Sequence, residues 1–206
     1  GVSQMGGHVS IAVVPHESVW KLPEGLDPIA ASGLVLTQVG YNCGSRPPVN
    51  PGDFTVVMGD GLVGHWAAQA LAWRGARVAM VGRHNFRLKR LHLEEAITVN
   101  SRREDPVKVI QKWHEGVSDG IAALVDTVGS IPTLYIFLPL MRPQGYICSA
   151  GFYGAEGKID IQKLRRGEQT LHCLSGYTRE RIDQTLQLLA SGELDTTSLI
   201  THRFPA

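Results

Sequence analysis

Three glycines with the spacing G-x-G-x-x-G are the residues of this sequence that point most clearly to chemistry. Gly59, Gly61 and Gly64 lie between a short apolar run at 54–58 and a segment at 62–73 with helical composition. The first glycine of such a loop permits a tight turn, the second lets the backbone approach a pyrophosphate, and the third lets the helix pack on a sheet. Backbone N–H groups at the start of the helix then meet the negative phosphates. The alternative is a glycine-rich turn that merely packs well. The predicted dinucleotide loop consists of Gly59, Asp60, Gly61, Leu62, Val63 and Gly64.

The residue expected to contact the ribose of such a ligand lies about 20 residues beyond the loop, at the end of the second strand. An acidic residue there favours NAD, but the sequence at 81–84 reads Val-Gly-Arg-His. The guanidinium of Arg83 fits a 2′-phosphate, so NADP is the predicted cofactor and NAD the alternative. Arg83 as a solvated surface residue is the other interpretation. His84 contacts the adenine or a phosphate, or is a histidine of a surface turn.

Two further strand ends are expected to face the cofactor, because ligands of parallel sheets bind at the carboxyl ends of the strands. Thr127 and Val128 follow one of these strands, and Ala150 and Gly151 follow the other. Their small side chains leave room for a ribose and a nicotinamide. Asp126, just before them, either caps the following helix or contacts the cofactor.

The elements that must position these residues follow from the apolar pattern. From residue 53 onward, short apolar runs alternate with longer amphipathic segments, which predicts an α/β fold with a doubly wound parallel sheet, the Rossmann fold. The predicted strands are 54–58, 77–81, 96–100, 122–127 and 145–149, with further extended segments at 158–164 and 169–174. The predicted helices are 62–73, 85–93, 106–114, 132–140 and 178–190, with Gly192 ending the last one. Before this series we expect a strand at 9–14, a connector, and one buried helix at 27–41; the tail from residue 198 begins another strand-like run.

Composition excludes several classes of function. The 206 residues carry 20 Lys and Arg against 19 Asp and Glu, a formal charge of +1 that argues against a nucleic-acid binder. The 43% of hydrophobic residues can fill a sizeable core, and no apolar run near 20 residues predicts a membrane span. The first residues do not resemble a secretory signal, and the three cysteines form no C-x-x-C pair. A soluble protein of the reducing cytoplasm is therefore expected.

Three stretches of the sequence resemble the medium-chain dehydrogenase/reductase family. They are GGHVSIAVVPHESVWKLPEGLDPIAASGLVLTQVGY, VVMGDGLVGHWAAQALAWRGARVAMVGRH and LITHRFPA. The resemblance implies a Rossmann cofactor domain at 27–192, with partial remnants of a GroES-like catalytic domain at 1–26 and 193–206. Most of the family's catalytic domain would precede residue 1. GYICSAGFYG and LITHRFPA are also similar to the bacteriochlorophyllide dehydrogenase branch.

The same resemblance bears on zinc and on acid/base chemistry. One family zinc ligand aligns near Val35, and a valine cannot bind metal, so no zinc site is expected in this chain. Cys43 is a ligand in another arrangement or a buried thiol. Thr37 and Tyr153 are the polar candidates near the expected nicotinamide, and core or rim packing is the favoured explanation for each. No catalytic residue is assigned.

Two functions follow as hypotheses. The first is an NADP-preferring oxidoreductase that transfers hydride between NAD(P)(H) and an alcohol, aldehyde or ketone. The alternative is a dinucleotide-binding module without catalytic activity of its own, because the substrate domain is largely absent. A scaffold that has lost cofactor binding is disfavoured by the intact glycine loop. The resemblance also implies a homodimer joined at the sheet edge, here 169–174; the other expected partner is a small-molecule substrate, with neither nucleic acid nor membrane.

Overall fold

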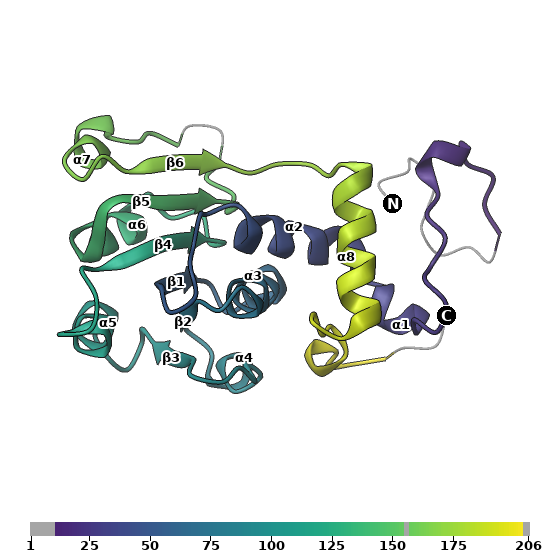
Figure 1. The fold of residues 1–206 in the computed structure, drawn as a ribbon, viewed down its shortest axis with the longest axis horizontal. Coiled ribbons are helices and arrows are strands. Elements are labelled where there is room, and N and C mark those ends of the chain that lie inside the picture. Colours follow the sequence, from purple (N-terminus) through teal and green to yellow (C-terminus); the bar gives the residue numbers. More distant parts are fainter. Residues whose placement is uncertain (1–10, 155–156, 204–206) are drawn as a thin grey trace.

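One parallel sheet of six strands organises the chain (Figure 1). The computed structural model describes residues 11–154 and 157–203. The strand order is β3-β2-β1-β4-β5-β6, and every neighbouring pair is parallel. The chain thus winds outward from β1 in both directions, which confirms the predicted doubly wound sheet. The strands are β1 (Phe54–Met58), β2 (Arg77–Gly82), β3 (Ile97–Asn100), β4 (Ile121–Asp126), β5 (Met141–Ser149) and β6 (Thr170–Cys173).

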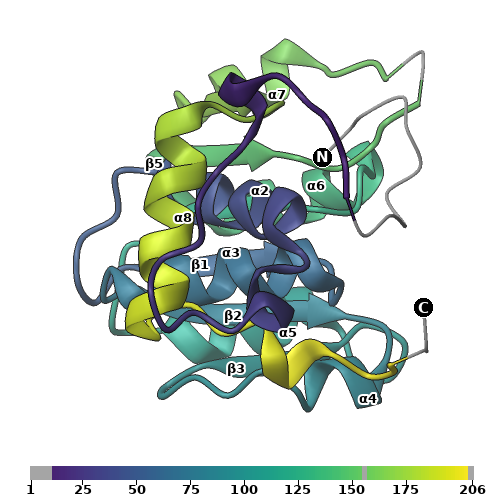
Figure 2. The same ribbon diagram turned by 90° about the vertical axis from the view of Figure 1, so that its right-hand side faces the viewer.

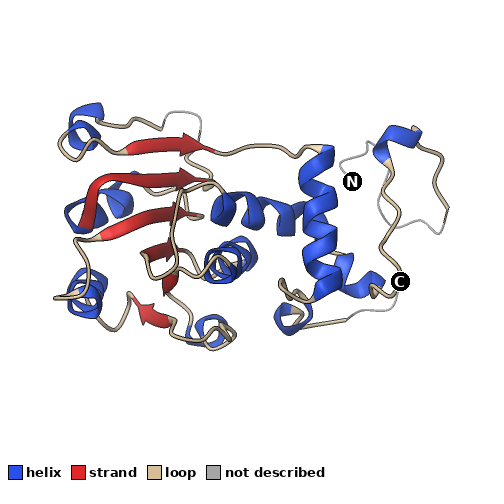
Figure 3. Ribbon diagram, viewed as in Figure 1, coloured by secondary structure: helices blue, strands red, loops and turns tan. Residues whose placement is uncertain are grey.

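Helices cover both faces of this sheet (Figure 3). They are α1 (Pro28–Ala31), α2 (Leu34–Ser45), α3 (Leu62–Trp73), α4 (Asn85–Leu88), α5 (Pro106–His114), α6 (Ile131–Phe137), α7 (Ile161–Arg165) and α8 (Arg179–Ser191). Short 3-10 turns lie at His16–Ser18, Leu138–Leu140 and Thr197–Leu199.

The central strands are buried on both faces, which explains their nearly continuous apolar sequence. All residues of β1 and β4 are buried. Val57 of β1 packs in one apolar cluster with Ala67 and Leu71 of α3. The neighbouring Val56 points to the other face, where it packs in a second cluster with Phe137 of α6. Alternate side chains of one strand therefore hold helices on opposite faces of the sheet.

Several helix ends follow the chemistry that the sequence predicts. The carboxylate of Asp105 accepts the N–H of Val107 at 3.0 Å, and Pro106 occupies the first helical position of α5. Gly192 ends α8 with a φ of 84°, in the left-handed region.

The predicted single helix at 27–41 is wrong, because the chain breaks into α1 and α2 at Ser32 and Gly33. The hydroxyl of Ser32 turns back to the carbonyl of Ile29 at 2.7 Å. A Cβ at Gly33 would lie 3.3 Å from the ring of Trp66, so the break brings the backbone close against α3.

Other predicted elements also differ from the structure. The predicted helix at 85–93 stops at Leu88, because Leu91 and Leu93 turn into the apolar cluster beneath α3. The predicted extended segment at 158–164 contains helix α7, which Asp160 caps through the N–H of Gln162. Residues 11–14 form no strand, and the rest of the predicted strand at 9–14 lies outside the described residues. The tail forms a 3-10 turn and no strand up to residue 203; 204–206 are not described.

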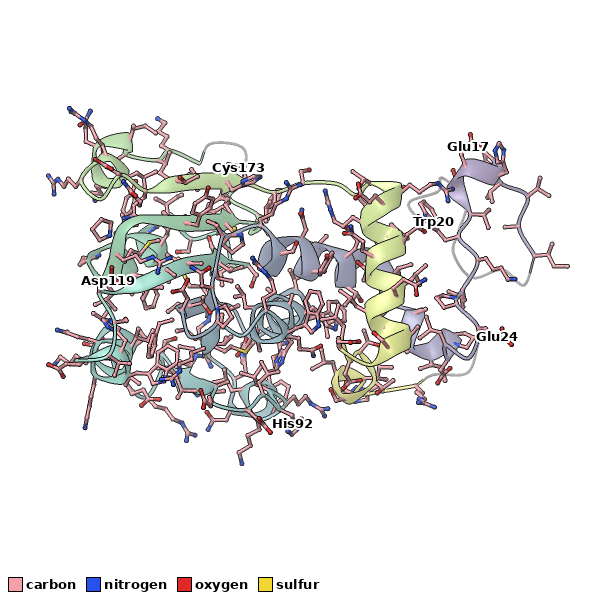
Figure 4. The ribbon with its side chains drawn as sticks, viewed as in Figure 1. Glu17, Trp20, Glu24, His92, Asp119 and Cys173 are labelled. Atoms are coloured by element: carbon pink, nitrogen blue, oxygen red, sulfur yellow. The ribbon has the colours of Figure 1, made fainter. Side chains whose placement is uncertain are left out.

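Helix α8 separates the sheet from the segment that precedes α1 (Figure 1). Figure 2 shows α2 and α3 side by side behind α8. Arg179 at the start of α8 donates to the carbonyl of Glu17 at 2.7 Å, and its guanidinium lies 4.7 Å from the ring centre of Trp20. Figure 4 labels Glu17 and Trp20 in the segment before α1. The domain boundaries at 26/27 and 192/193 stay a prediction. Across the described ranges, we find no helix with the length and apolarity that crossing a membrane requires.

The three cysteines differ in burial. Burial raises the pKa of Cys43 and of Cys148 to about 12, whereas Cys173 is exposed at the end of β6 (Figure 4). We expect an aromatic disulfide reagent at pH 8 to modify one thiol of the folded protein and three in urea. Cys173→Ser should leave none in the folded state. Rapid modification of two thiols in that variant would contradict the burial of Cys43 and Cys148.

Candidate functional site

The glycine loop lies at the carboxyl end of β1, beside the point where the strand order reverses between β1 and β4. Gly59 has a φ of 114°, which favours glycine, and its N–H donates to the carbonyl of Val81 at 2.8 Å. A Cβ on Gly59 would lie 2.2 Å from Oγ1 of Thr127. A Cβ on Gly64 would lie 2.1 Å from the carbonyl oxygen of Gly59. The fold itself therefore requires glycine at these two positions.

Gly61 differs from the other two glycines of the loop. Its φ of −85° and ψ of 178° are open to any residue, and no atom lies within 4 Å of a Cβ built on it. The fold does not require glycine here. The absence of a side chain leaves free space directly above the N-terminus of α3, where the N–H groups of the first turn point outward.

A cavity of about 400 Å³ adjoins this free space. Two arginines, Arg87 and Arg90, contribute cationic side chains to it, and Leu62 at the start of α3 is 44% exposed. Cationic groups beside a helix N-terminus suit an anionic ligand. The residues that line the cavity are Asp60, Gly61, Leu62, His65, Phe86, Arg87, Arg90, Leu199 and Thr201.

The turn after β2 is tied to the glycine loop by Asp60. Its Oδ2 accepts the N–H of Arg83 at 2.9 Å and the N–H of His84 at 2.7 Å, and lies 3.0 Å from Nδ1 of His84. Arg87 lies 3.8 Å from Oδ1. Burial alone would raise the pKa of Asp60, but the hydrogen bonds from Arg83 and His84 outweigh it and hold the pKa below its ordinary value.

The sequence prediction placed Asp60 in the loop but missed the reach of its side chain. The available signal was Gly82, at the end of β2. A Cβ on Gly82 would lie 2.5 Å from Cβ of Asp60, so glycine at this strand end makes room for an acid from the loop. The side chain of Arg83 is exposed, and that of His84 is half-buried against Asp60.

Asp126 joins the ends of β4 and β5. Its backbone carbonyl accepts the N–H groups of Ala150 at 2.9 Å and Gly151 at 3.0 Å. Its Oδ1 accepts the N–H groups of Val128 at 2.8 Å and Gly129 at 3.1 Å. The carboxylate is fully buried. Through its carbonyl and its carboxylate, Asp126 thus holds both strand-end loops that the sequence predicts to face a cofactor.

One further contact of Asp126 and the cap of α6 define the role of this residue in the fold. Oδ2 accepts the hydroxyl of Tyr153. The cap of α6 is Ser130, which accepts the N–H of Thr133 at 3.4 Å, so the interpretation of Asp126 as the helix cap is wrong. Asp126 instead organises its own turn and the loop after β5.

The two strand-end loops touch each other and the glycine loop. A Cβ on Gly151 would lie 2.0 Å from the backbone nitrogen of Gly129. The hydroxyl of Thr127 donates to the carbonyl of Met58, just before the glycine loop, at 2.8 Å. Val128 is 43% exposed at this edge. The structure therefore brings the loops of β1, β4 and β5 together, with the turn after β2 on the other side of the glycine loop.

The polar candidates for acid/base chemistry are already engaged. Thr37 is buried and donates to the carbonyl of Gly33 at 3.0 Å within its own helix. Burial and the neighbouring Asp126 raise the pKa of Tyr153 above its ordinary value, so this phenol keeps its proton and donates a hydrogen bond to Asp126. Neither group is free to exchange a proton with a ligand in this arrangement.

The residues of the described part of the chain do not fit a zinc ion. No group of three or more His, Cys, Asp or Glu side chains within 11–154 and 157–203 is placed to hold a metal. Val35, at the aligned ligand position in the first turn of α2, has a hydrocarbon side chain that cannot bind metal.

Comparisons with known proteins agree with the fold described above. A family model described as zinc-binding dehydrogenase matches residues 63–191. An uncharacterised zinc-type alcohol dehydrogenase-like protein, YdjJ of Escherichia coli strain K12, is 26% identical over 91% of this chain and 54% of its own length. The NADP-dependent isopropanol dehydrogenase of Entamoeba histolytica is 28% identical over 86% of this chain and 50% of its own.

A solved structure of a dehydrogenase has a similar fold. ECK1772, an Escherichia coli oxidoreductase/dehydrogenase of unknown specificity, superposes with a TM-score of 0.78 at 26% identity, covering 89% of this chain and 52% of that one. The chain thus spans about half the length of the curated relatives it matches.

Proposed function

Because the chain belongs to the zinc-binding dehydrogenase family, we propose that it binds a nicotinamide dinucleotide on the loop Gly59–Gly64 as part of an oxidoreductase. The reaction is hydride transfer between NAD(P)(H) and an alcohol, aldehyde or ketone. The observation that carries the proposal is the contrast among the three glycines. Two of them are required by the fold, and Gly61 is required only if a ligand approaches the backbone.

The chain's own residues have three tasks in this proposal. Backbone N–H groups of Gly61, Leu62 and Val63 bind the pyrophosphate at the N-terminus of α3. Arg87 and Arg90 supply positive charge in the adjoining cavity. Bound NAD(P) supplies the hydride chemistry at its nicotinamide ring.

The loops after β4 and β5 orient the nicotinamide half of the cofactor and keep water from it. Thr127, Val128, Ala150 and Gly151 are the residues of these loops in the proposal. Their small size and the contacts of Asp126 fix the shape of the surface against which a flat ring can lie.

A second candidate function is a dinucleotide-binding module that has no turnover of its own. Thr37 and Tyr153 are engaged in hydrogen bonds inside the fold. The chain also spans about half the length of its relatives. The engagement of Thr37 and Tyr153 favours an active site whose acid/base group lies outside the described residues.

A titration of the purified chain with NADPH and NADH tests the proposal, followed by an assay of the same sample against alcohols and aldehydes. Binding with turnover supports the oxidoreductase. Tight binding without turnover supports the binding module. Binding of neither dinucleotide overturns both functions and leaves only the fold.

NADP is the preferred cofactor in this proposal, because Arg83 stands exposed where an acid would favour NAD. Arg83→Asp is expected to weaken NADPH binding by about tenfold or more and NADH binding far less. The substitution replaces a cationic hydrogen-bond donor to the 2′-phosphate with a negative charge that repels it. Dissociation constants from fluorescence titration measure the effect. Lys108→Asp on α5 is the matched control, since it makes the same charge change on an exposed side chain away from the loop. Equal weakening of both cofactors would remove Arg83 from 2′-phosphate recognition.

The partner in this proposal is a second copy of the chain, joined along β6. This strand ends the sheet, and Thr170 and Cys173 on it are exposed. An open strand edge supports pairing with another edge strand.

A further inference from the structure

Asp60 connects two parts of the site that the sequence places 23 residues apart. It lies in the glycine loop, between Gly59 and Gly61, but its carboxylate sits over Gly82 at the end of β2. There it accepts the N–H groups of both residues that follow the strand, Arg83 and His84. A loop that faces one phosphate is thereby fastened to the turn proposed to face another.

Both oxygens of this carboxylate have partners within the protein. Oδ2 accepts two backbone N–H groups and lies within hydrogen-bond distance of Nδ1 of His84; Oδ1 lies 3.3 Å from the same nitrogen and 3.8 Å from Arg87. The side chain is 9% exposed. An acid that selects NAD at a strand end needs a free oxygen for the ribose hydroxyl. The occupied carboxylate of Asp60 instead acts on the backbone of the turn.

The side chains of Arg83 and His84 differ in their contacts with Asp60. The imidazole of His84 folds back onto Asp60, whereas the guanidinium of Arg83 remains exposed. The direction of the Cα–Cβ bond of Arg83 follows from the peptide planes on either side of it, and both planes are held by the carboxylate of Asp60. A fixed backbone leaves less of the turn to be ordered when a ligand binds.

We infer that Asp60 is a positioning residue for cofactor discrimination: it fixes the turn that carries Arg83 against the glycine loop, and so sets the preference for NADPH over NADH. The inference rests on the proposed function, and specifically on recognition of the 2′-phosphate by Arg83. The glycine loop binds the part common to both cofactors, and the turn meets the part in which they differ.

Asp60→Ala tests this inference by removing the acceptor of the two N–H groups. NADPH binding is expected to weaken by about tenfold and NADH binding by no more than about threefold, because the turn loses its fixed position. Asp60→Asn retains a carbonyl oxygen for the same N–H groups and should restore the ratio to within about threefold of wild type. Titrations of each variant with both cofactors give the ratio, and thermal unfolding verifies that each is folded.

Gly82→Ala disturbs the same contact from the other side, since its Cβ would lie 2.5 Å from Cβ of Asp60. It is expected to lower the NADPH:NADH ratio in the same direction, and it serves if Asp60→Ala does not fold. Asp53→Ala is the matched control. Asp53 is a comparably buried carboxylate at the opposite end of β1, where it accepts the N–H of Asn50 at 2.9 Å and pairs with Arg142 at 2.9 Å. Its loss should reduce stability and leave the ratio unchanged.

The outcomes separate this inference from the function on which it rests. A wild-type chain without preference for NADPH overturns the proposed preference and the inference together. A wild-type preference that Asp60→Ala retains, or that increases because a repelling carboxylate is gone, overturns the inference alone. Equal weakening of NADPH binding and NADH binding assigns Asp60 a purely structural role and also overturns the inference.

Discussion

Gly61→Val is expected to raise the dissociation constants of both NADPH and NADH by about a hundredfold or more, while the protein stays folded. The backbone angles at Gly61 suit any residue, and a Cβ there meets no atom within 4 Å. Valine therefore fits the protein but fills the space through which a pyrophosphate reaches the N–H groups of α3. Equilibrium titration with each cofactor measures the loss, and the unfolding midpoint should stay within a few degrees of wild type.

Gly64→Val is the informative comparison for this prediction. A Cβ on Gly64 would lie 2.1 Å from the carbonyl oxygen of Gly59, so the helix cannot keep its place. This variant should lose stability as well as binding, whereas Gly61→Val loses binding alone. Unchanged affinity in a folded Gly61→Val protein would remove the glycine loop from the cofactor site.

Asp126→Ala is expected to destabilise the fold by about 3–5 kcal/mol, a large share of the roughly 5–15 kcal/mol that holds a domain together. The carboxylate is fully buried and accepts the N–H groups of Val128 and Gly129 and the hydroxyl of Tyr153. Alanine leaves these three donors without their acceptor, at a cost of about 1–3 kcal/mol for each buried one. The midpoint and slope of urea unfolding measure the change.

Two milder variants bracket this result. Tyr153→Phe removes one of the three donors and leaves Oδ2 of Asp126 without that partner, so it should cost about 1–3 kcal/mol. Asp105→Ala removes the exposed cap of α5 and should cost about 1 kcal/mol. If Asp126→Ala unfolds no more easily than Asp105→Ala, the buried carboxylate does not organise the two strand-end loops.

The sheet could be predicted from the sequence because its strands are short apolar runs with helices between them. The glycine loop could be predicted for a related reason: the residues from Phe54 to Trp73 are contiguous, so strand, loop and helix are read in one pass. The order of the strands then follows from the doubly wound pattern.

The parts that could not be predicted depend on residues far apart in the sequence. The break at Gly33 results from packing against Trp66, and α4 ends early because Leu91 turns into the core. The side chain of Asp60 finds its partners 23 and 24 residues away. Local composition carries no information about such contacts, because each exists only after tertiary packing.

The hydrogen bonds around the glycine loop also differ in the length of chain that they close. Asp60 reaches Arg83 and His84 across 23 and 24 residues, whereas Thr127 reaches Met58 across 69. The entropy lost on closing a loop grows with its length, and long-range pairings form late in folding. The first β-α-β unit can thus acquire its loop-to-turn connection before β4 arrives. We therefore expect the two sides of the glycine loop to form at different stages of folding, the side towards β2 through a local contact and the side towards β4 through a more distant one.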